Sequence, residues 1–457
     1  MQYCNNNGSD DEDDQKCLAT TTPFDGQVLI LSESGKPIFY SKGDEDEICS
    51  FFGVISIIVQ RYHSLGNEDG RDSLLSIQRR DLFFQFLYRS PLILCLVSRQ
   101  PCNLHIQLDT IYNQIISMFS RKMLREYYQK RGSNFDIRSL FGIFFNCFIK
   151  IFFYFLYGID KRVEACKKGF NEDPAILYGF RILPLLPTDR DFLVQTMGNI
   201  INELCPNVVA FGLLIAHRQL VALVRFKRLN LDAPDFNTIV NLIECHKANM
   251  IHSDHQFPFC LPKFDPNQFL YAYISYLWEG TGPCLVLLSI TNSDYEKLTQ
   301  IRPKLEENIS SYKYNTRLVS ALSNPEGFCL QENIKWAEQL WHFIYKNTSN
   351  TQDPTQVCCS TPKKPFISYQ ELILLYNGYT KLADLLRKSG GGIKMLFQML
   401  ERYVLFAWIT TSFELYCTFS PFTSQKKAME IAERLLHVLR KEEKRVLFSC
   451  SPAILVG

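Results

Sequence analysis

Histidine and cysteine side chains gather in one short segment of the chain, "ECHKANMIHSDHQFPFC" (244–260). Its Cys245, His246, His252, His255 and Cys260 belong to the residue types that bind zinc through sulfur and imidazole nitrogen. No Cys-x-x-Cys pair fixes a tetrahedral geometry, and the segment lies between a predicted helix and a predicted strand. We interpret it as a surface loop with ordinary histidines, with a structural metal as the alternative. The prediction is therefore no metal site and no cofactor.

Two glycine-containing stretches match a phosphate-binding loop only in part. "SESGKP" (32–37) has a Gly-Lys pair, but Ile30 stands where the P-loop motif has its first glycine, and Pro37 stands where it has Ser or Thr. A hairpin turn is the better interpretation. "SGGG" (389–392) has no following Lys-Ser/Thr and is interpreted as a linker.

No catalytic signature is present elsewhere. The sequence has no GxSxG and no HExxH motif, and no Cys-His pair in a recognisable arrangement. Paired acids such as Glu442–Glu443 and Asp10–Asp11 fall on polar faces or in the polar N-terminal stretch, where solvation explains them. We therefore expect no covalent or acid–base catalysis.

Basic residues form two clusters. "SRKMLREYYQKRG" contains Arg121, Lys122, Arg125, Lys130 and Arg131, and "DKRVEACKKG" contains Lys161, Arg162, Lys167 and Lys168. The net charge of +2 gives no bulk attraction for nucleic acid, which is not an expected partner. Solvated helix ends are the first interpretation. Contact of Arg121–Arg131 with anionic lipid heads is the second, because each Lys or Arg near such a surface contributes about 1 kcal/mol.

The composition is that of a globular protein, with 46% hydrophobic and 21% charged residues. The 16 cysteines are scattered, mostly inside apolar runs, which indicates small core residues in a reducing compartment. Cys358 and Cys359 are the exception and are predicted to lie in a flexible polar loop. Residues 1–23 are acidic and polar without an apolar core, so we expect a disordered tail and no signal peptide.

Three stretches share one pattern of two strands around a turn followed by a helix: 81–98, 267–290 and 401–420. A further hairpin and helix precede the first two, and the third copy is less regular. Helices covering antiparallel sheets predict an α+β fold used three times. The expected divisions are a first domain at 24–162, a helical linker at 163–204, a second domain at 205–312 and a third at 330–450.

Several strings in order carry a family resemblance: "LILSESGKPIFYSKG", "YRSPLILCLVSR", "VRFKRLNLDAPDFNTIVNLI", "FCLPKFDPNQFLYAYISYL" and "FAWITTSFELYCTFSPF". They resemble the Mon/SAND family of vacuolar fusion proteins, the Mon subunit of the Mon–Ccz complex. The resemblance covers nearly the whole folded chain and implies three longin domains. It also implies a heterodimer with a Ccz-type longin protein that exchanges guanine nucleotide on the late-endosomal Rab GTPase. The implied location is cytoplasmic, with peripheral recruitment to the anionic membrane of late endosomes and lysosomes or vacuoles.

The helix Glu47–His63 is the predicted binding element, since the family's first longin domains are implied to hold the Rab. Apolar residues lie nearly all round it, whereas a helix with one buried face shows a polar stripe. A partner on a second face would explain the excess, and a fully enclosed core helix is the open alternative. The expected contacts are Glu47, Phe51, Phe52, Val54, Ile55 and Ile58. Changing Phe51 or Ile55 to Asp should abolish exchange without unfolding. A longin adaptor or tether without exchange activity is the competing function.

The run "GIFFNCFIKIFFYFLYG" (142–158) is the strongest membrane signal in the chain. A span of this length is near the short limit, and Lys150 near its middle costs about 2.5–3.5 kcal/mol. A buried helix is the second interpretation, although six of the residues 143–157 are Phe. Because the flanks join in the family register without 143–157, we favour an in-frame retained intron.

Overall fold

The computed structural model describes residues 26–41, 45–65, 74–80, 82–99, 103–135, 158–172, 179–227, 229–250, 254–278, 282–323, 336–348, 356–360, 368–441 and 453–455. The chain divides into two compact units, 1–171 and 172–457. The predicted tail at 1–23 and the anomalous run at 143–157 lie outside the described residues. So does the acid pair Glu442–Glu443.

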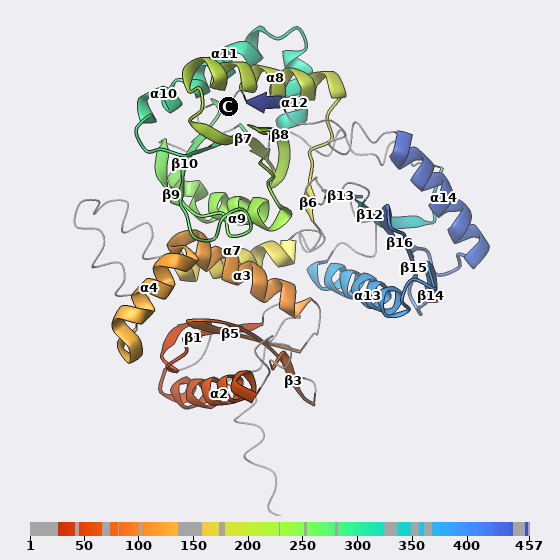
Figure 1. Cartoon of the computed structure of the whole chain (residues 1–457). Helices are drawn as coiled ribbons and strands as arrows, with labels where there is room; N and C mark the ends of the chain where they lie inside the picture. Colours follow the sequence, from red (N-terminus) through yellow and green to blue (C-terminus); the bar gives the residue numbers. More distant parts are fainter. Residues whose placement is uncertain are drawn as a thin grey trace, which may run out of the picture. The chain divides into compact units, whose positions relative to one another are not determined.

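The first unit contains a five-stranded antiparallel sheet in the order β2-β1-β5-β4-β3. Its strands are β1 (Gln27–Ser32), β2 (Pro37–Tyr40), β3 (Ser76–Arg79), β4 (Leu82–Arg89) and β5 (Leu92–Ser98). Helix α2 (Glu45–Leu65) covers one face and α3 (Leu104–Phe119) the other, as Figure 1 shows. The central strands β1 and β5 are therefore buried along their whole length. Helices α4 (Arg121–Arg131) and α7 (Gly158–Glu172) and the turn η1 (Gly132–Asn134) complete the unit.

The stretch "SESGKP" is a hairpin turn, as predicted. The backbone N–H of Ser32 donates to the carbonyl of Lys36 at 2.9 Å, closing the turn between β1 and β2. Gly35 has a φ of +79°, a left-handed conformation that glycine adopts without steric cost. A phosphate-loop function for this stretch is not needed to explain its residues.

The second domain has a six-stranded sheet in the order β17-β8-β7-β11-β10-β9. Its strands are β7 (Val209–Ala216), β8 (Gln219–Phe226), β9 (His255–Phe259), β10 (Leu270–Tyr276), β11 (Cys284–Ser289) and β17 (Ala453–Leu455). Helix α9 (Ala233–Met250) lies on one face, and α8 (Pro187–Leu204) and α11 (Ile301–Ser311) lie on the other (Figure 1). Helices α10 (Tyr295–Thr299) and α12 (Asn315–Ser323) flank α11. A core cluster of buried apolar residues joins α8, α11 and α12 to the sheet.

A buried carboxylate ties α9 to the loop between β9 and β10. Asp235, in the first turn of α9, accepts hydrogen bonds from the backbone N–H groups of Lys263 at 3.0 Å and Phe264 at 2.8 Å. Burial raises the pKa of Asp235 to about 6, and these two hydrogen bonds oppose the rise. The loop is thus held by a group whose charge changes at mildly acidic pH.

The third domain has a six-stranded sheet in the order β14-β15-β16-β12-β13-β6. Its strands are β12 (Leu340–Asn347), β13 (Gln356–Cys359), β14 (Met395–Met399), β15 (Val404–Ile409), β16 (Phe413–Phe419) and the short β6 (Phe180–Arg181). Helix α13 (Tyr369–Lys388) packs on one face and α14 (Gln425–Lys441) on the other. This copy is as regular as the other two. The prediction of three α+β units is therefore confirmed.

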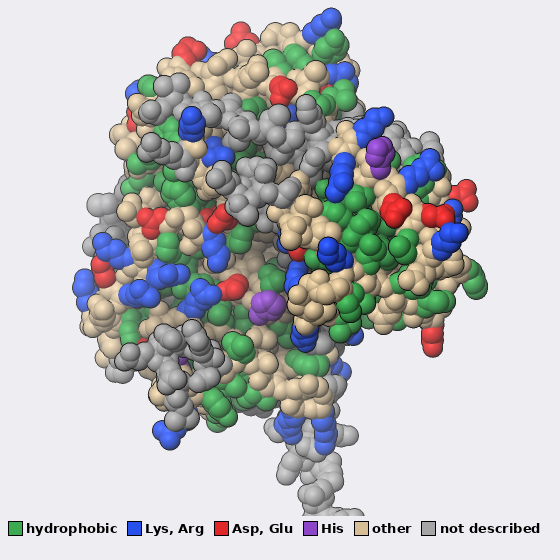
Figure 2. All heavy atoms as spheres, turned by 45° about the vertical axis from the view of Figure 1, so that its right-hand side comes forward, with side chains coloured by type: hydrophobic (Ala, Val, Ile, Leu, Met, Phe, Trp, Pro, Cys, Tyr) green, Lys and Arg blue, Asp and Glu red, His purple; other side chains and the backbone are tan. Residues whose placement is uncertain are grey.

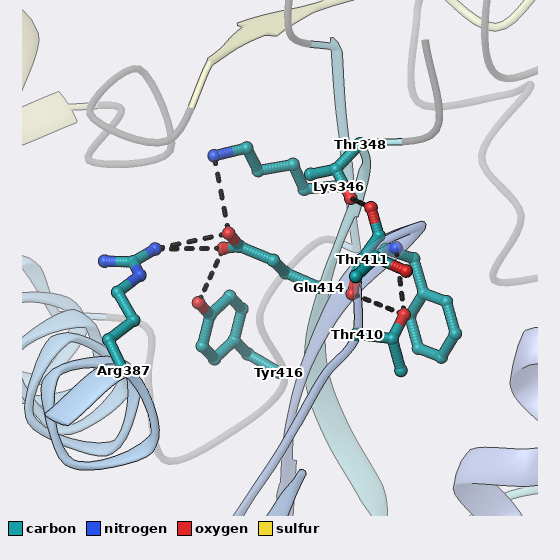
Figure 3. A network of polar contacts seen from close by, with 8 residues as sticks. Lys346, Thr348, Arg387, Thr410, Thr411, Glu414 and Tyr416 are labelled. Atoms are coloured by element: carbon teal, nitrogen blue, oxygen red, sulfur yellow. Dashed lines mark hydrogen bonds and ion pairs between the residues drawn. The ribbon is translucent and has the colours of Figure 1, made fainter. Parts of the chain in front are cut away.

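A polar network fastens the C-terminal end of α13 to the sheet (Figure 3). Glu414 of β16 is only 8% exposed and accepts hydrogen bonds from Arg387 at 3.2 and 3.3 Å and from the Tyr416 hydroxyl at 2.8 Å. The ammonium group of Lys346 lies 3.7 Å from the same carboxylate. The buried charge is thus compensated from two sides, as such a group requires.

Three local expectations need correction. Cys358 and Cys359 belong to β13 and pair with β12, and Cys358 is buried, so they are not in a flexible loop. Arg162 and Lys167 are not solvated helix residues: they are 2% and 8% exposed, Arg162 donates to the Ser117 hydroxyl at 2.7 Å, and Lys167 donates to the Glu164 carboxylate at 3.3 Å. The "SGGG" run (389–392) is the tight connection from α13 to β14 and not an interdomain linker.

Candidate partner-binding surface

Helix α2 has one face in the core of the first unit. Phe52, Ile55 and Val59 are 1%, 3% and 2% exposed, and they recur at the i, i+3, i+7 spacing of one helix face. They pack with Leu29 of β1, Phe86 of β4 and Ile93 of β5, among others. Residues of the same domain cover all three side chains, so this face of α2 is not available to a partner.

Beside this core face α2 carries further apolar residues that are open to water, and Ile57 lies on the far side of the helix. Val54, Ile57 and Tyr62 are 52%, 70% and 50% exposed, and Phe51 and Ile58 are partly exposed beside them. Phe51, Val54, Ile58 and Tyr62 follow the i, i+3, i+7, i+11 spacing of a single stripe. Among the described residues nothing covers these side chains, which favours a partner over a fully enclosed core helix as the explanation of the apolar excess.

Polar contacts on the other flank fix the rotation of α2 about its axis. The hydroxyl of Ser56 donates to the backbone carbonyl of Glu33 at 3.0 Å, and the side-chain amide of Gln60 donates to the same carbonyl. The Tyr88 hydroxyl donates to the Glu33 carboxylate at 2.6 Å, and burial together with this contact raises the pKa of Tyr88. The β1–β2 turn therefore anchors the helix, so that the apolar stripe points toward the opposite edge of the sheet.

That edge is the strand β3, and it continues the apolar stripe. Ile77 of β3 lies opposite Phe84 of β4, so their side chains share the α2 side of the sheet. The Phe84 ring is 6.3 Å from the ring of Phe51. Ile77 and the preceding Leu75 are 37% and 64% exposed. We name the resulting patch the α2–β3 surface; it consists of Phe51, Val54, Ile57, Ile58, Tyr62, Leu75 and Ile77.

The α2–β3 surface has the chemistry of a protein-binding patch. Large apolar side chains gathered on one helix and one neighbouring strand are unusual on a surface that stays in water. β3 is also the last strand of its sheet in the part of the chain that the structure describes. Its outer backbone groups can therefore pair with a strand of another chain, as sheet edges do.

The structure divides the predicted contact residues into two groups. Phe51, Val54 and Ile58 belong to the α2–β3 surface, whereas Phe52 and Ile55 lie in the core and are inaccessible to a partner. The expectation that Ile55→Asp leaves the fold intact is corrected accordingly, because it would bury a carboxylate. The side chain of Glu47 lies outside the described residues.

Four members of this surface are not among the contacts predicted from the sequence. Ile57 was within the apolar run, and its position two residues from Ile55 places it on the far side of a helix. Tyr62, seven residues after Ile55, has the period of the core face, and only the folded structure shows that it is half exposed. Leu75 and Ile77 had no comparable signal, since only the folded sheet brings β3 beside α2.

The predicted lipid-binding residues lie together on α4. Lys122, Arg125, Lys130 and Arg131 are exposed and Arg121 is partly exposed, while Leu124 and Tyr127 are buried on the other side of the helix. The Ser120 side chain caps α4 by accepting from the backbone N–H of Met123 at 3.3 Å. Glu126 is the acidic residue among these cations. Figure 2 shows basic side chains gathered at the left of the view, with a few acidic ones beside them.

The segment 244–260 provides no assembled metal site among the residues that the structure describes. Cys260 is buried, and its thiol donates to the carbonyl of Asp265 at 3.2 Å. The side chains of His246, His252 and His255 lie outside the described residues. In the described ranges, no helix is both long and apolar enough to cross a membrane.

Sequence comparisons assign all three domains to one group. Residues 26–151, 207–305 and 339–443 match the families described as the first, second and third longin domains of FUZ, MON1 and HPS1. The matches follow the order of the three sheets. The chain belongs to the Mon/SAND family. The resemblance found in the sequence is thus confirmed, including its three longin domains.

Relatives that match nearly the whole of this chain agree with this assignment. The vacuolar fusion protein MON1 homolog A of Bos taurus is 28% identical over 451 residues, covering 97% of this chain and 75% of the relative. Protein SAND of Takifugu rubripes is 28% identical over 431 residues, covering 93% and 76%. The MON1 homolog of Arabidopsis thaliana is 26% identical over 453 residues, covering 92% and 68%.

Proposed function

We propose that this chain acts in vacuolar or lysosomal fusion as one subunit of a heterodimeric guanine-nucleotide exchange factor. Its partner would be a Ccz-type longin protein, and its substrate would be the late-endosomal Rab GTPase. The single observation that carries the proposal is the α2–β3 surface in the first longin domain of a Mon/SAND chain. A patch of this kind supports a protein partner, and relatives named as vacuolar fusion proteins support the process.

A mechanism in which guanine nucleotide is released through binding alone fits the residues of this chain. An exchange factor binds the nucleotide-free GTPase more tightly than the loaded form, so by linkage it weakens nucleotide binding by the same factor. This chemistry requires a rigid surface and no proton donor or nucleophile. Anchored by Ser56 and Gln60 on one flank and by its core face, α2 supplies such a surface.

The α2–β3 surface would bind the first longin domain of the Ccz-type partner. The apolar stripe would pack against the partner's apolar residues, and the open edge of β3 would pair with one of its strands. Helix α4 would then contact anionic lipid heads through Lys122, Arg125 and their neighbours, which recruits the complex peripherally and can be measured by vesicle co-sedimentation.

The test compares two variants in which an exposed aliphatic residue of similar size is replaced by aspartate. Ile57→Asp places a charge in the α2–β3 surface, and Leu374→Asp, at a position that is 50% exposed on α13, is the matched control. Each variant is co-expressed with the Ccz-type protein, and release of labelled GDP from the purified Rab is followed. We expect Ile57→Asp to lose the partner and at least tenfold in exchange rate, and Leu374→Asp to keep both.

The outcomes separate the proposal from its competitor. If a folded Ile57→Asp complex exchanges nucleotide at the full rate, the α2–β3 surface is not needed for exchange and this part of the proposal is refuted. If the unchanged complex assembles but does not accelerate nucleotide release, the chain is a longin adaptor or tether and the exchange function is refuted.

A further inference from the structure

Two separate chain segments cover the outer edge of β8 in the second longin domain. On its inner edge β8 pairs with β7. On the outer edge Ile182 forms a parallel bridge with Leu220, and β17 pairs in parallel with Val224–Phe226. Both segments run in the same direction as β8, although one comes from the middle of the chain and the other from its end (Figure 1). This edge therefore accepts extended peptide from more than one source.

The segment at Ile182 is fixed in place. Its backbone is continuous with β6, which pairs in parallel with β13 of the third domain. Phe180, Ile182 and Leu183 are at most 4% exposed, and the N–H of Leu183 donates to the carbonyl of Leu220 at 3.0 Å. Held on two sheets and buried, this segment cannot leave without opening both domains.

Strand β17 is attached far less firmly. It has three residues, and β8 is its sole strand partner in the described part of the chain. It lies beside α8 and is joined to the third domain only through residues 442–452, which follow α14. A strand of three residues has few backbone hydrogen bonds to lose, and weakly held strands of this kind are the elements that open first.

The acceptor side is built to receive an apolar strand. Val224 is fully buried, and Phe226 is a partly buried member of the same core cluster as Phe192 and Val194 of α8. The paired segment itself reads Ala453-Ile454-Leu455. The main-chain ladder supplies attraction for any extended peptide. On the face of Val224 and Phe226 the apolar surroundings favour apolar residues, whereas Arg225, opposite Ile454, lies on the other face of the strand.

We propose that the outer edge of β8, from Val224 to Phe226, is a peptide-binding site for an extended apolar segment. In the free chain the site is occupied by the chain's own strand β17. A partner's apolar strand binds there in parallel to β8 after β17 leaves. The site lies in the second longin domain, so it is independent of the exchange activity proposed for the first.

The test uses a labelled peptide, SPAILVG, corresponding to residues 451–457. It is titrated by fluorescence anisotropy into the full chain and into a variant lacking residues 451–457. A short tether gives its strand an effective concentration on the order of 1 mM. For a peptide with a Kd of about 0.1 mM, the full chain should therefore bind about tenfold more weakly than the shortened variant.

The control peptide carries proline at both 454 and 455. Successive N–H groups of a strand point to opposite edges, so one of the two must face β8, and proline removes it. Equal binding of both peptides, or equal binding by both chains, would overturn the proposal. So would the absence of binding by a shortened variant that keeps the melting temperature of the full chain.

A second measurement covers the case in which the shortened variant does not fold. In the full chain, hydrogen exchange of residues 453–455 should be at least about 100-fold faster than that of β7, because β17 opens locally. Added unlabelled peptide should not change the exchange of β7. Protection of β17 equal to that of β7 would show that it is a permanent strand and would refute the proposal.

Discussion

Replacing Ile55 or Ile57 by alanine removes the same atoms from the same helix, yet the consequences should differ greatly. Ile55 is 3% exposed and packs in the core cluster of the first unit, whereas Ile57 is 70% exposed. Truncation of a buried isoleucine to alanine costs about 2–5 kcal/mol, through lost burial and the cavity that remains. At Ile57 little burial is lost and alanine is the better helix former, so the change should be within about 0.5 kcal/mol.

Hydrogen exchange of β1 and β5 measures this difference in the full chain. The four tryptophans all lie after residue 171, so their fluorescence does not report on the first unit. Since every 1.4 kcal/mol is a factor of ten, Ile55→Ala should accelerate exchange of these strands by roughly 30-fold or more, and Ile57→Ala by less than about threefold. Similar effects of the two variants would refute the division of α2 into a core face and a free face.

Two further predictions concern charge. The pKa of Asp235 is about 6, against an ordinary value of 3.8. The folded state therefore holds the proton more tightly than the unfolded state, which stabilises the second domain at low pH. This contribution, roughly 3 kcal/mol, is lost as the pH rises through 6. Asp235→Asn should therefore weaken the fall in the urea midpoint between about pH 4 and 7; an unchanged pH profile would contradict it. Changing both Lys122 and Arg125 to Glu should weaken binding to phosphatidylserine vesicles by about 30-fold or more, and the same change at Lys426 and Lys441 of α14 should not, whereas equal losses would show that α4 has no special role.

The parts of the fold that could be predicted from the sequence are those formed by hydrogen bonds and packing between residues close together in the chain. The turn chemistry of "SESGKP" and the alternating aromatic strands around short turns predict hairpins, and the period of 424–445 predicts α14. These signals are local, since a turn or a helix face is decided by residues within a few positions of each other. They failed where the residues were polar or the strand was short, as at Cys358–Cys359, whose place in β13 depends on pairing with the distant β12.

The sequence by itself determined the family, the threefold α+β repeat and the excess of apolar residues on α2. It could not divide that excess between core and surface, because both faces have the same residue types. Tertiary structure made that decision: Glu33 anchors one flank of α2, and the sheet buries Ile55 and leaves Ile57 in water. The fold alone also placed β3 beside α2 and returned the C-terminal strand to β8, since such contacts join residues far apart in the chain.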